Sequence, residues 1–359
     1  MMYKHKKVPV ICALLIILAA REVLASPFMM IASGDPALDD LRLVALEAGL
    51  TILSLTPPLS RDEIENILNI TDSGSLSEAA AEAYARLESR LNPQPRFSEE
   101  GFALMANLIL QFEAGIRSNS GIPWQGNGAM RPAALGLPIG AYFFNAAEIF
   151  IAPEVRLDPG FNETDGHFLT NVPYEAGRVD MFFPFRAYIA FGGKNWNFQI
   201  GRDALNFGTA RRGNLLISDS PDYYEFGRLS FFSRHFKYTA LVTHIPLFIE
   251  DDLYDTSTLP DDALTESLER YLYIHRFDVN LFDKLSLAFS EGLTVGNSPL
   301  SLRYLNPLMI MHNWTSGDEY PNWAGGRELN SSIFFVEANW TPIRHLHFYG
   351  QIVIDELTT

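Results

Sequence analysis

Apolar and polar residues alternate along residues 271–296, whose sequence is YLYIHRFDVNLFDKLSLAFSEGLTVG. Successive side chains of a β-strand point to opposite faces. One face of the first half therefore carries Phe277, Val279 and Leu281, and the other carries Arg276, Asp278 and Asn280. Asp283 and Lys284 leave almost no loop before the second half begins. The pattern predicts two long strands joined by a tight turn, with one face suited to an apolar environment and the other to water.

The same two-residue period begins at about residue 100 and continues toward the end of the sequence. It is clearest in the segments 108–117, 183–191, 196–201, 236–243 and 346–355. Each predicted strand has roughly nine to eleven residues, the length that a tilted strand needs to cross a bilayer. Two environments fit this pattern: a soluble β-sandwich, or a membrane barrel with an apolar exterior and a polar lumen.

The predicted connections between strands sort by length. Those at 192–195, 233–235, 282–284 and 341–345 are short, and those at 203–222, 247–270 and 296–331 are long. Outer-membrane barrels have short periplasmic turns and long outer loops, so the connections favour the barrel. Keeping every short connection at one end requires a further strand between residues 121 and 146, for which residues 133–145 are the best candidate. The count is then about eleven strands. Because single-chain barrels usually close with an even number, we expect the chain to be truncated or its edges to be completed by another segment.

One acidic residue conflicts with the alternation. Glu291 falls on the same predicted face as Leu287, Phe289 and Leu293, and burying a charge in an apolar environment is costly. A β-bulge near Glu291 would turn it toward the lumen. The sequence leaves both orientations open.

Residues 1–25 have the layout of a secretory signal: a basic start, an apolar run of about 13 residues and a small-residue cleavage site after Ala25. The run is shorter than the roughly 20 residues of a spanning helix, and no later segment reaches that length. Cys12, the single cysteine, would leave with the signal, so no disulfide is expected. Cleavage would remove four basic residues and one acidic residue, moving the formal charge from −16 to −19. This charge disfavours nucleic acid as a partner.

Residues 26–97 show helical periodicity instead. The N-terminal capping signals are Asp35 with Pro36, Ser60 with Glu63, and Ser75 with Glu78. Gly49 is placed to end the first helix, and Pro93 and Pro95 close the region. The sequence therefore predicts a small periplasmic domain of three short helices over residues 26–97. A transmembrane antiparallel β-barrel, incomplete as counted above, would follow over residues 98–359.

Two segments carry residues beyond the alternation. Residues 201–229 read GRDALNFGTARRGNLLISDSPDYYEFGRL, and residues 302–314 read LRYLNPLMIMHNW. Both resemble the capsule assembly Wzi family, whose members are outer-membrane barrels preceded by a signal peptide and a small helical bundle. The Arg-Tyr-Leu-Asn-Pro run is the more specific of the matching motifs. Where the family has a Pro-Phe-Asp-like turn after the Ser-Asp pair, this chain has PDYYEF.

The resemblance implies a lectin-like, non-catalytic role in which the barrel binds surface or capsular polysaccharide, or helps to attach and assemble it. Guanidinium groups suit sugar hydroxyls and acidic groups, amides make paired contacts, and aromatic rings offer flat apolar faces. The candidate polysaccharide-binding residues are Arg202, Arg211, Arg212, Asn214, Arg303, Tyr304, Asn306 and Trp314. The polar members of this set are equally suited to bracing loops across the lumen.

Two other functions fit the strand pattern: a porin-like outer-membrane channel and a soluble exported β-sandwich enzyme. No triad or carboxylate pair stands out in the sequence, so catalysis is not expected, and neither is a metal or cofactor. The expected partners are polysaccharide and the lipid of the cell outer membrane.

Overall fold

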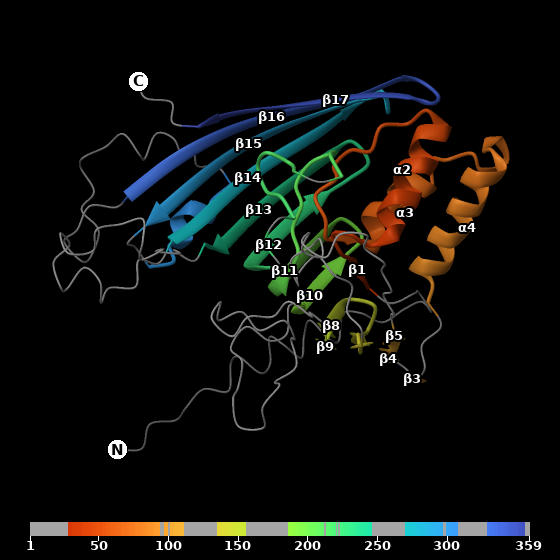
Figure 1. Ribbon diagram of the computed structural model, residues 1–359, viewed down its shortest axis with the longest axis horizontal. Helices are drawn as coiled ribbons and strands as arrows, with labels where there is room; N and C mark the ends of the chain where they lie inside the picture. Colours follow the sequence, from red (N-terminus) through yellow and green to blue (C-terminus); the bar gives the residue numbers. More distant parts are fainter. Residues whose placement is uncertain are drawn as a thin grey trace, which may run out of the picture.

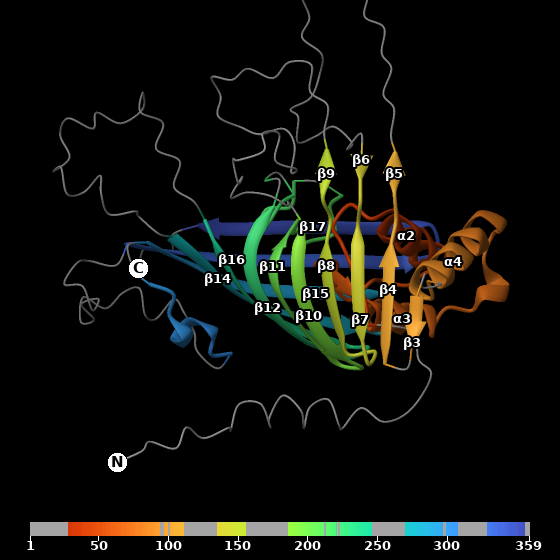
Figure 2. The same ribbon diagram turned by 90° about the horizontal axis from the view of Figure 1, so that it is seen from below.

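A computed structural model describes residues 28–93, 97–99, 101–110, 135–155, 186–211, 213–219, 221, 223–245, 270–296, 299–307 and 329–355. The signal segment and the candidates Arg212 and Trp314 lie outside these residues. The described chain forms three α-helices, one antiparallel sheet of twelve strands and two small sheets. The large sheet curves into a trough, and the helices lie at one end of it (Figures 1 and 2).

The three predicted helices are α2 (Pro36–Ala48), α3 (Arg61–Leu68) and α4 (Glu78–Leu91). Asp35 caps α2 by accepting a hydrogen bond from the backbone N–H of Ala37 at 2.9 Å. Gly49 ends α2 in a left-handed conformation, with φ at 71°. The Ser60 N–H donates to Glu63 Oε2 at 2.8 Å, which forms the expected capping box of α3. No described helix is long and apolar enough to cross a membrane.

The predicted cap of the third helix was wrong by two residues. Ser77 caps α4, and its hydroxyl accepts from the N–H of Ala80. Ser75 instead ends the short 3-10 turn η1 (Ser73–Ser75). Glu78 is the first residue of α4, so it lies too early in the helix to complete a capping box.

The twelve strands of the large sheet pair with their neighbours along the chain. They are β3 (Phe97–Glu99), β4 (Phe102–Ala106), β7 (Ile139–Phe143), β8 (Ala147–Ile151), β10 (Ala187–Gly193), β11 (Trp196–Asp203), β12 (Tyr224–Phe232), β13 (Phe236–His244), β14 (Arg270–Leu281), β15 (Leu285–Gly296), β16 (Leu329–Ile343) and β17 (Leu346–Asp355). The strand predicted within residues 133–145 is confirmed as β7. The count exceeds the predicted eleven because of the three-residue β3.

Two small sheets flank the large one. β5 (Ile109–Leu110), β6 (Leu135–Gly136) and β9 (Glu154–Val155) pair beyond the ends of β4, β7 and β8, while β1 (Met30–Ile31) pairs with β2 (Leu59–Ser60). Among the described residues, β3 and β17 are the edges of the large sheet and do not pair with each other. The sheet is therefore open in the described residues. The sequence predicted an incomplete barrel, and a barrel is not confirmed.

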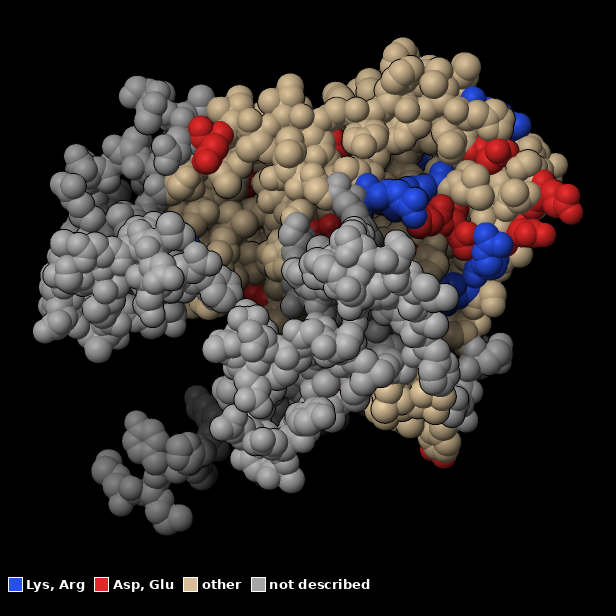
Figure 3. All heavy atoms as spheres, in the orientation of Figure 1, with Lys and Arg blue, Asp and Glu red and all other residues tan. Residues whose placement is uncertain are grey.

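The two faces of the sheet differ as the alternation predicted. The convex face, called the outward face below, exposes large apolar side chains that include Phe191, Ile200, Phe231, Phe277, Phe289 and Ile352. The concave face buries polar side chains that include Gln199, Arg228, Lys237, Arg276, Asp278 and Glu337. Over β16 and β17 the surface in Figure 3 is mostly uncharged. No second sheet packs on the outward face in the described part of the chain, so a β-sandwich core is not formed there.

The short connections all lie at the end of the trough next to the helices (Figure 1). Between β14 and β15, the Asp283 carbonyl accepts a hydrogen bond from Thr51 N–H at 2.8 Å. Between β16 and β17, His345 N–H donates to the carbonyl of Leu46 at the end of α2, at 3.2 Å. The predicted sorting of short connections to one end is confirmed.

Glu291 faces outward, and no bulge turns it inward. β14 and β15 pair in an unbroken register from Leu285 to Gly296, which sets Glu291 opposite His275. Pairing of β15 with β16 is also unbroken here. The acid is tolerated because this end of the outward face is not left bare: residues 299–307, including the 3-10 turn η5 (Leu302–Leu305), pack onto it.

Candidate functional site

Two segments occupy the concave face of the sheet. The first is the inner segment, residues 51–60, which leads into α3. The second is the inward loop, residues 204–219, which connects β11 and β12. The carbonyl of Leu53 accepts a hydrogen bond from Ser286 Oγ at 2.7 Å, and the carbonyl of Leu55 accepts one from Gly208 N–H at 2.8 Å. Each segment therefore contacts the other and the sheet, so a loop expected at the outer end folds back into the trough.

A buried charge cluster fixes the inner segment and α3 to the sheet. Lys237 of β13 forms an ion pair with Glu63 of α3, and their side chains are only 2% and 7% exposed. Lys237 Nζ also donates to Thr56 Oγ1 at 2.8 Å, and Arg228 donates to the Thr56 carbonyl at 3.0 Å. Burial alone would raise the pKa of Glu63, but Lys237 and Arg228 together hold it below its ordinary value. Glu63 is thus an anion held between two cations.

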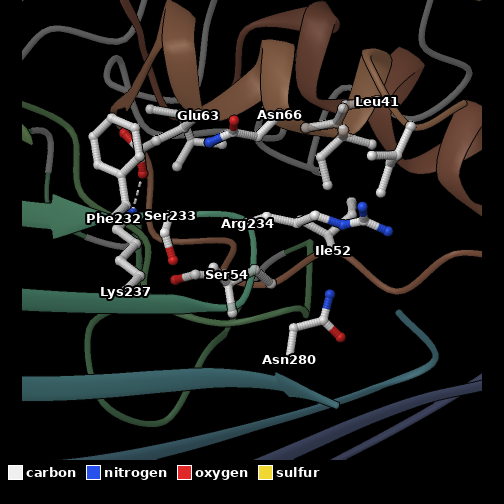
Figure 4. Close-up of a pocket in the computed structure, with 14 residues that line it drawn as sticks. Leu41, Ile52, Ser54, Glu63, Asn66, Phe232, Ser233, Arg234, Lys237 and Asn280 are labelled. Atoms are coloured by element: carbon white, nitrogen blue, oxygen red, sulfur yellow. Dashed lines mark hydrogen bonds and ion pairs between the residues drawn. The ribbon is translucent and has the colours of Figure 1, made fainter. Parts of the chain in front are cut away.

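The pocket beside this cluster is too small for a sugar ring. Figure 4 shows Glu63 and Asn66 of α3 on one side of it, and Lys237 and Asn280 of the sheet on the other. Its volume is about 30 Å³, which suits about one water molecule. We therefore regard the Glu63 cluster as the contact that joins helices and sheet, and not as a ligand site.

A second polar network fixes the inward loop. The buried amide of Asn214 donates to Asn206 Oδ1 at 2.6 Å and to the carbonyl of Ala210 at 2.8 Å. Gln351 of β17 donates both to Asn214 Oδ1 and to Glu337 of β16, each at 2.6 Å. Asn214, predicted as a polysaccharide contact, is thus occupied with internal hydrogen bonds and braces the loop.

Glu337 connects this loop to the middle of the sheet. It accepts a hydrogen bond from Thr209 N–H at 3.3 Å and lies 3.4 Å from Arg276, which also pairs with Asp278 at 2.8 Å. All three charged side chains are buried. Leaving any of these buried charges without its hydrogen-bond or ion-pair partner would be costly. The network therefore favours a single position of the inward loop against the sheet.

Among the described candidate polysaccharide-binding residues on the concave side, Arg211 is the one exposed to solvent. Its side chain is 73% exposed and pairs with Asp39 of α2. Asp39 is also 3.2 Å from Arg42, one turn along the same helix, so two guanidinium groups share one carboxylate. Burial is the main cause that lowers the pKa of Arg42, and the neighbouring Arg211 lowers it further. Charged side chains in Figure 3 gather over the helices and beside them.

The other described candidates lie elsewhere. Arg202 pairs across the strands with Glu225 and stacks on the ring of Tyr223 at 4.3 Å. By strand alternation it shares the outward face with Ile200. Arg303, Tyr304 and Asn306 belong to the segment that packs on the outward face. The structure therefore divides the predicted set among three places and does not gather it into one site.

Sequence reasoning missed Asp39 and Arg42. Asp39 and Arg42 are three residues apart, which is the usual spacing of an ion pair on a helix surface. This spacing does not predict that the inward loop contacts α2. Within the described residues, no group of three or more His, Cys, Asp or Glu side chains is placed to hold a metal ion.

Comparison with known proteins gives one structural likeness. No known protein-family model matches the chain, and no curated protein matches it in sequence. The fold is similar to that of Wzi from Escherichia coli, described as an outer membrane protein involved in group 1 capsule assembly and as a carbohydrate-binding β-barrel. The TM-score is 0.50 at 16% sequence identity, over 92% of this chain and 63% of Wzi. The chain thus has a Wzi-like, mainly β fold and spans less than two thirds of Wzi.

Proposed function

We propose that this chain is part of an outer-membrane β-barrel that binds surface polysaccharide without catalysing a reaction. Residues 1–25 would direct export, residues 26–97 would form the periplasmic helical domain, and residues 98–359 would belong to the barrel. The single observation that carries the membrane placement is the exposed apolar outward face, which spans the strands from β10 to β17. A water-soluble protein would expose several neighbouring Phe and Ile side chains at a high cost.

The likeness to Wzi supports polysaccharide as the ligand, and the Arg42–Asp39–Arg211 group gives that ligand a contact. With two cations and one anion, the group carries a net positive charge. The chain as a whole is acidic, at −16, so this local excess would orient an acidic polymer toward the concave side. The fork geometry of guanidinium suits the carboxylates of acidic sugars.

Conduction is the alternative, and the described residues do not favour it. The inner segment and the inward loop occupy the concave face, with polar networks between them and the sheet. We infer that these two segments plug the lumen, which distinguishes the chain from an open porin. Planar-bilayer conductance tests this point: a plugged barrel should give no steady current, and a stable open channel would overturn the inference.

Binding is tested with polygalacturonate as the acidic probe and dextran as the neutral one, using the purified chain in detergent. The chain should bind polygalacturonate and not dextran. Arg211→Gln should weaken that binding about fivefold, because an exposed charged contact is worth ~1 kcal/mol. Arg86→Gln is the matched control, since Arg86 of α4 is also exposed and pairs with Asp40 of α2 at 2.6 Å. Equal loss in both variants, or no binding by the parent chain, would count against the proposal.

A further inference from the structure

Residues 299–307, called the outer clip, pack on the outward face of the sheet. The ring of Tyr304 lies 5.0 Å from the ring of Tyr273, and the N–H of Ser301 donates to the Tyr273 hydroxyl at 2.8 Å. Tyr273 alternates onto the same face as Phe277, which is exposed. In Figure 2 the clip lies below the ends of β14 and β15, outside the trough that holds α2 and α3. The clip is thus on the opposite side of the sheet from the inward loop.

The inner side of the clip covers the polar part of the outward face. His275 is only 2% exposed and lies directly opposite Glu291 across β14 and β15. Tyr304, also 2% exposed, packs with Tyr273, Leu293 and Val295 over the same strand ends. The clip therefore packs over the strand ends beside the His275–Glu291 pair.

The outer side of the clip is apolar where it is most exposed. Leu302 is 76% exposed and Leu300 is 51% exposed, whereas Tyr304 is buried at 2%. Arg303 stays beside them, with its guanidinium 4.7 Å from the Tyr304 ring. Two protruding leucines next to an arginine form a residue combination found where protein meets the boundary of a bilayer.

We propose that the outer clip is a lipid-contact element at the loop end of the sheet. Leu300 and Leu302 enter the acyl region near the membrane boundary, and Arg303 lies toward the polar headgroups. The occupant is lipid because the leucines continue the exposed apolar face of Phe277 and Phe289, which lies on the same side of β14 and β15. This inference rests on the proposed membrane placement. It places Arg303 at the lipid boundary and not in contact with sugar, and it leaves Tyr304 buried beneath the clip.

The test uses nitroxide labels on single cysteines in phosphatidylcholine vesicles, in a Cys12→Ser background. Leu302→Cys reports the clip, Phe289→Cys reports the middle of the outward face, and Leu215→Cys reports the inward loop, where Leu215 is exposed. Electron paramagnetic resonance measures how often each label collides with oxygen, which concentrates in lipid, and with a nickel chelate, which stays in water. Leu302 is well exposed, so the substitution removes little packing, and Leu300→Cys provides a second label on the same clip.

The oxygen-to-nickel collision ratio at Leu302→Cys should be several-fold higher than at Leu215→Cys and should not exceed that at Phe289→Cys. Leu300→Cys should behave as Leu302→Cys does. If Phe289→Cys reports lipid while both clip labels report water, the clip inference is wrong and the membrane placement stands. If Phe289→Cys also reports water, both are wrong.

Discussion

Replacing Glu63 by glutamine should release the helices and the inner segment from the sheet. The Glu63→Gln substitution would keep the shape of the side chain and an oxygen that can accept the Ser60 N–H of the capping box. It would remove the charge that neutralises Lys237 and Arg228, and both of these are fully buried. The perturbation is therefore electrostatic and leaves the local helix cap in place.

The magnitude follows from the burial. Removing one partner of a buried ion pair costs about 3–5 kcal/mol, because the remaining charge is left without compensation. Glu63 and Lys237 are 7% and 2% exposed, so solvent screening reduces this little. At about 1.4 kcal/mol per tenfold change, local opening of the helices should become roughly 100-fold to 4,000-fold more frequent.

Hydrogen exchange with mass spectrometry measures this opening. Amides of α3 and of the inner segment should exchange faster by that factor in Glu63→Gln, while those in the middle of β14 and β15 should not change. Asp40→Asn is the control, because it breaks an exposed pair with Arg86 that is worth about 0–1 kcal/mol. If Glu63→Gln changed exchange no more than Asp40→Asn does, the buried cluster would not be what joins helices to sheet.

The same cluster predicts the pH dependence. The pKa of folded Glu63 lies below its ordinary value of 4.5, so the unfolded state binds the proton more readily. The stability contributed by Glu63 is therefore complete above pH 4.5 and is lost as the pH falls through the lower pKa of the folded state. Exchange in α3 should accelerate over that acidic range in the parent chain and change less in Glu63→Gln, as a pH series would measure.

Three further substitutions test other parts of the structure. Gly208→Ala should displace the inward loop from the sheet, since φ there is +142° and a Cβ would lie 2.7 Å from Glu337 Oε2. Proteolysis within residues 204–219 should then become faster. Gly213→Ala is the control and should have a smaller effect, because the space around Gly213 is open. Asn214→Ala should cost about 1–3 kcal/mol through the orphaned partners of its amide, measured as a lower denaturation midpoint in detergent at an unchanged slope. Phe277→Arg should disfavour insertion into vesicles by about 2–4 kcal/mol if Phe277 lies at mid-bilayer depth, measured by a urea titration of the inserted protein; an unchanged midpoint would show that this face does not meet lipid.

Local patterns in the sequence were enough for most of the strands, the turns and two of the helix caps. Of the strand predicted over 108–117, the structure describes only β5 (Ile109–Leu110), and residues 111–117 lie outside the described residues. Alternation sets the face of each side chain because the strand period is two, so the exposure of Phe277 and the burial of Arg276 followed directly. The Asp35 and Ser60 caps followed from side-chain hydrogen bonds within a few residues. The prediction that Ser75 caps the third helix was wrong because Ser77 can make the same hydrogen bond and lies directly before the first helical residue.

Loop positions could not be predicted in this way. The inward loop is fixed by partners such as Gln351, 137 residues from Asn214, and the outer clip is fixed by Tyr273. Neither contact has a periodic signal in the chain. The bulge considered at Glu291 is not formed, because the register there is unbroken. A segment later in the sequence packs on this end of the outward face, and strand periodicity does not predict such a contact.

The central claim is that lipid contacts the outward face while the concave face is filled by the chain itself. Single nitroxide labels at each position from Leu285 to Ser290 of β15, in vesicles and in the Cys12→Ser background, test it most directly. Collision with oxygen should rise at Leu287 and Phe289, and fall at Ser286 and Ser290, which are buried against the inner side. Free access of the nickel chelate to Leu287 and Phe289, or collision rates without a two-residue period, would contradict the account.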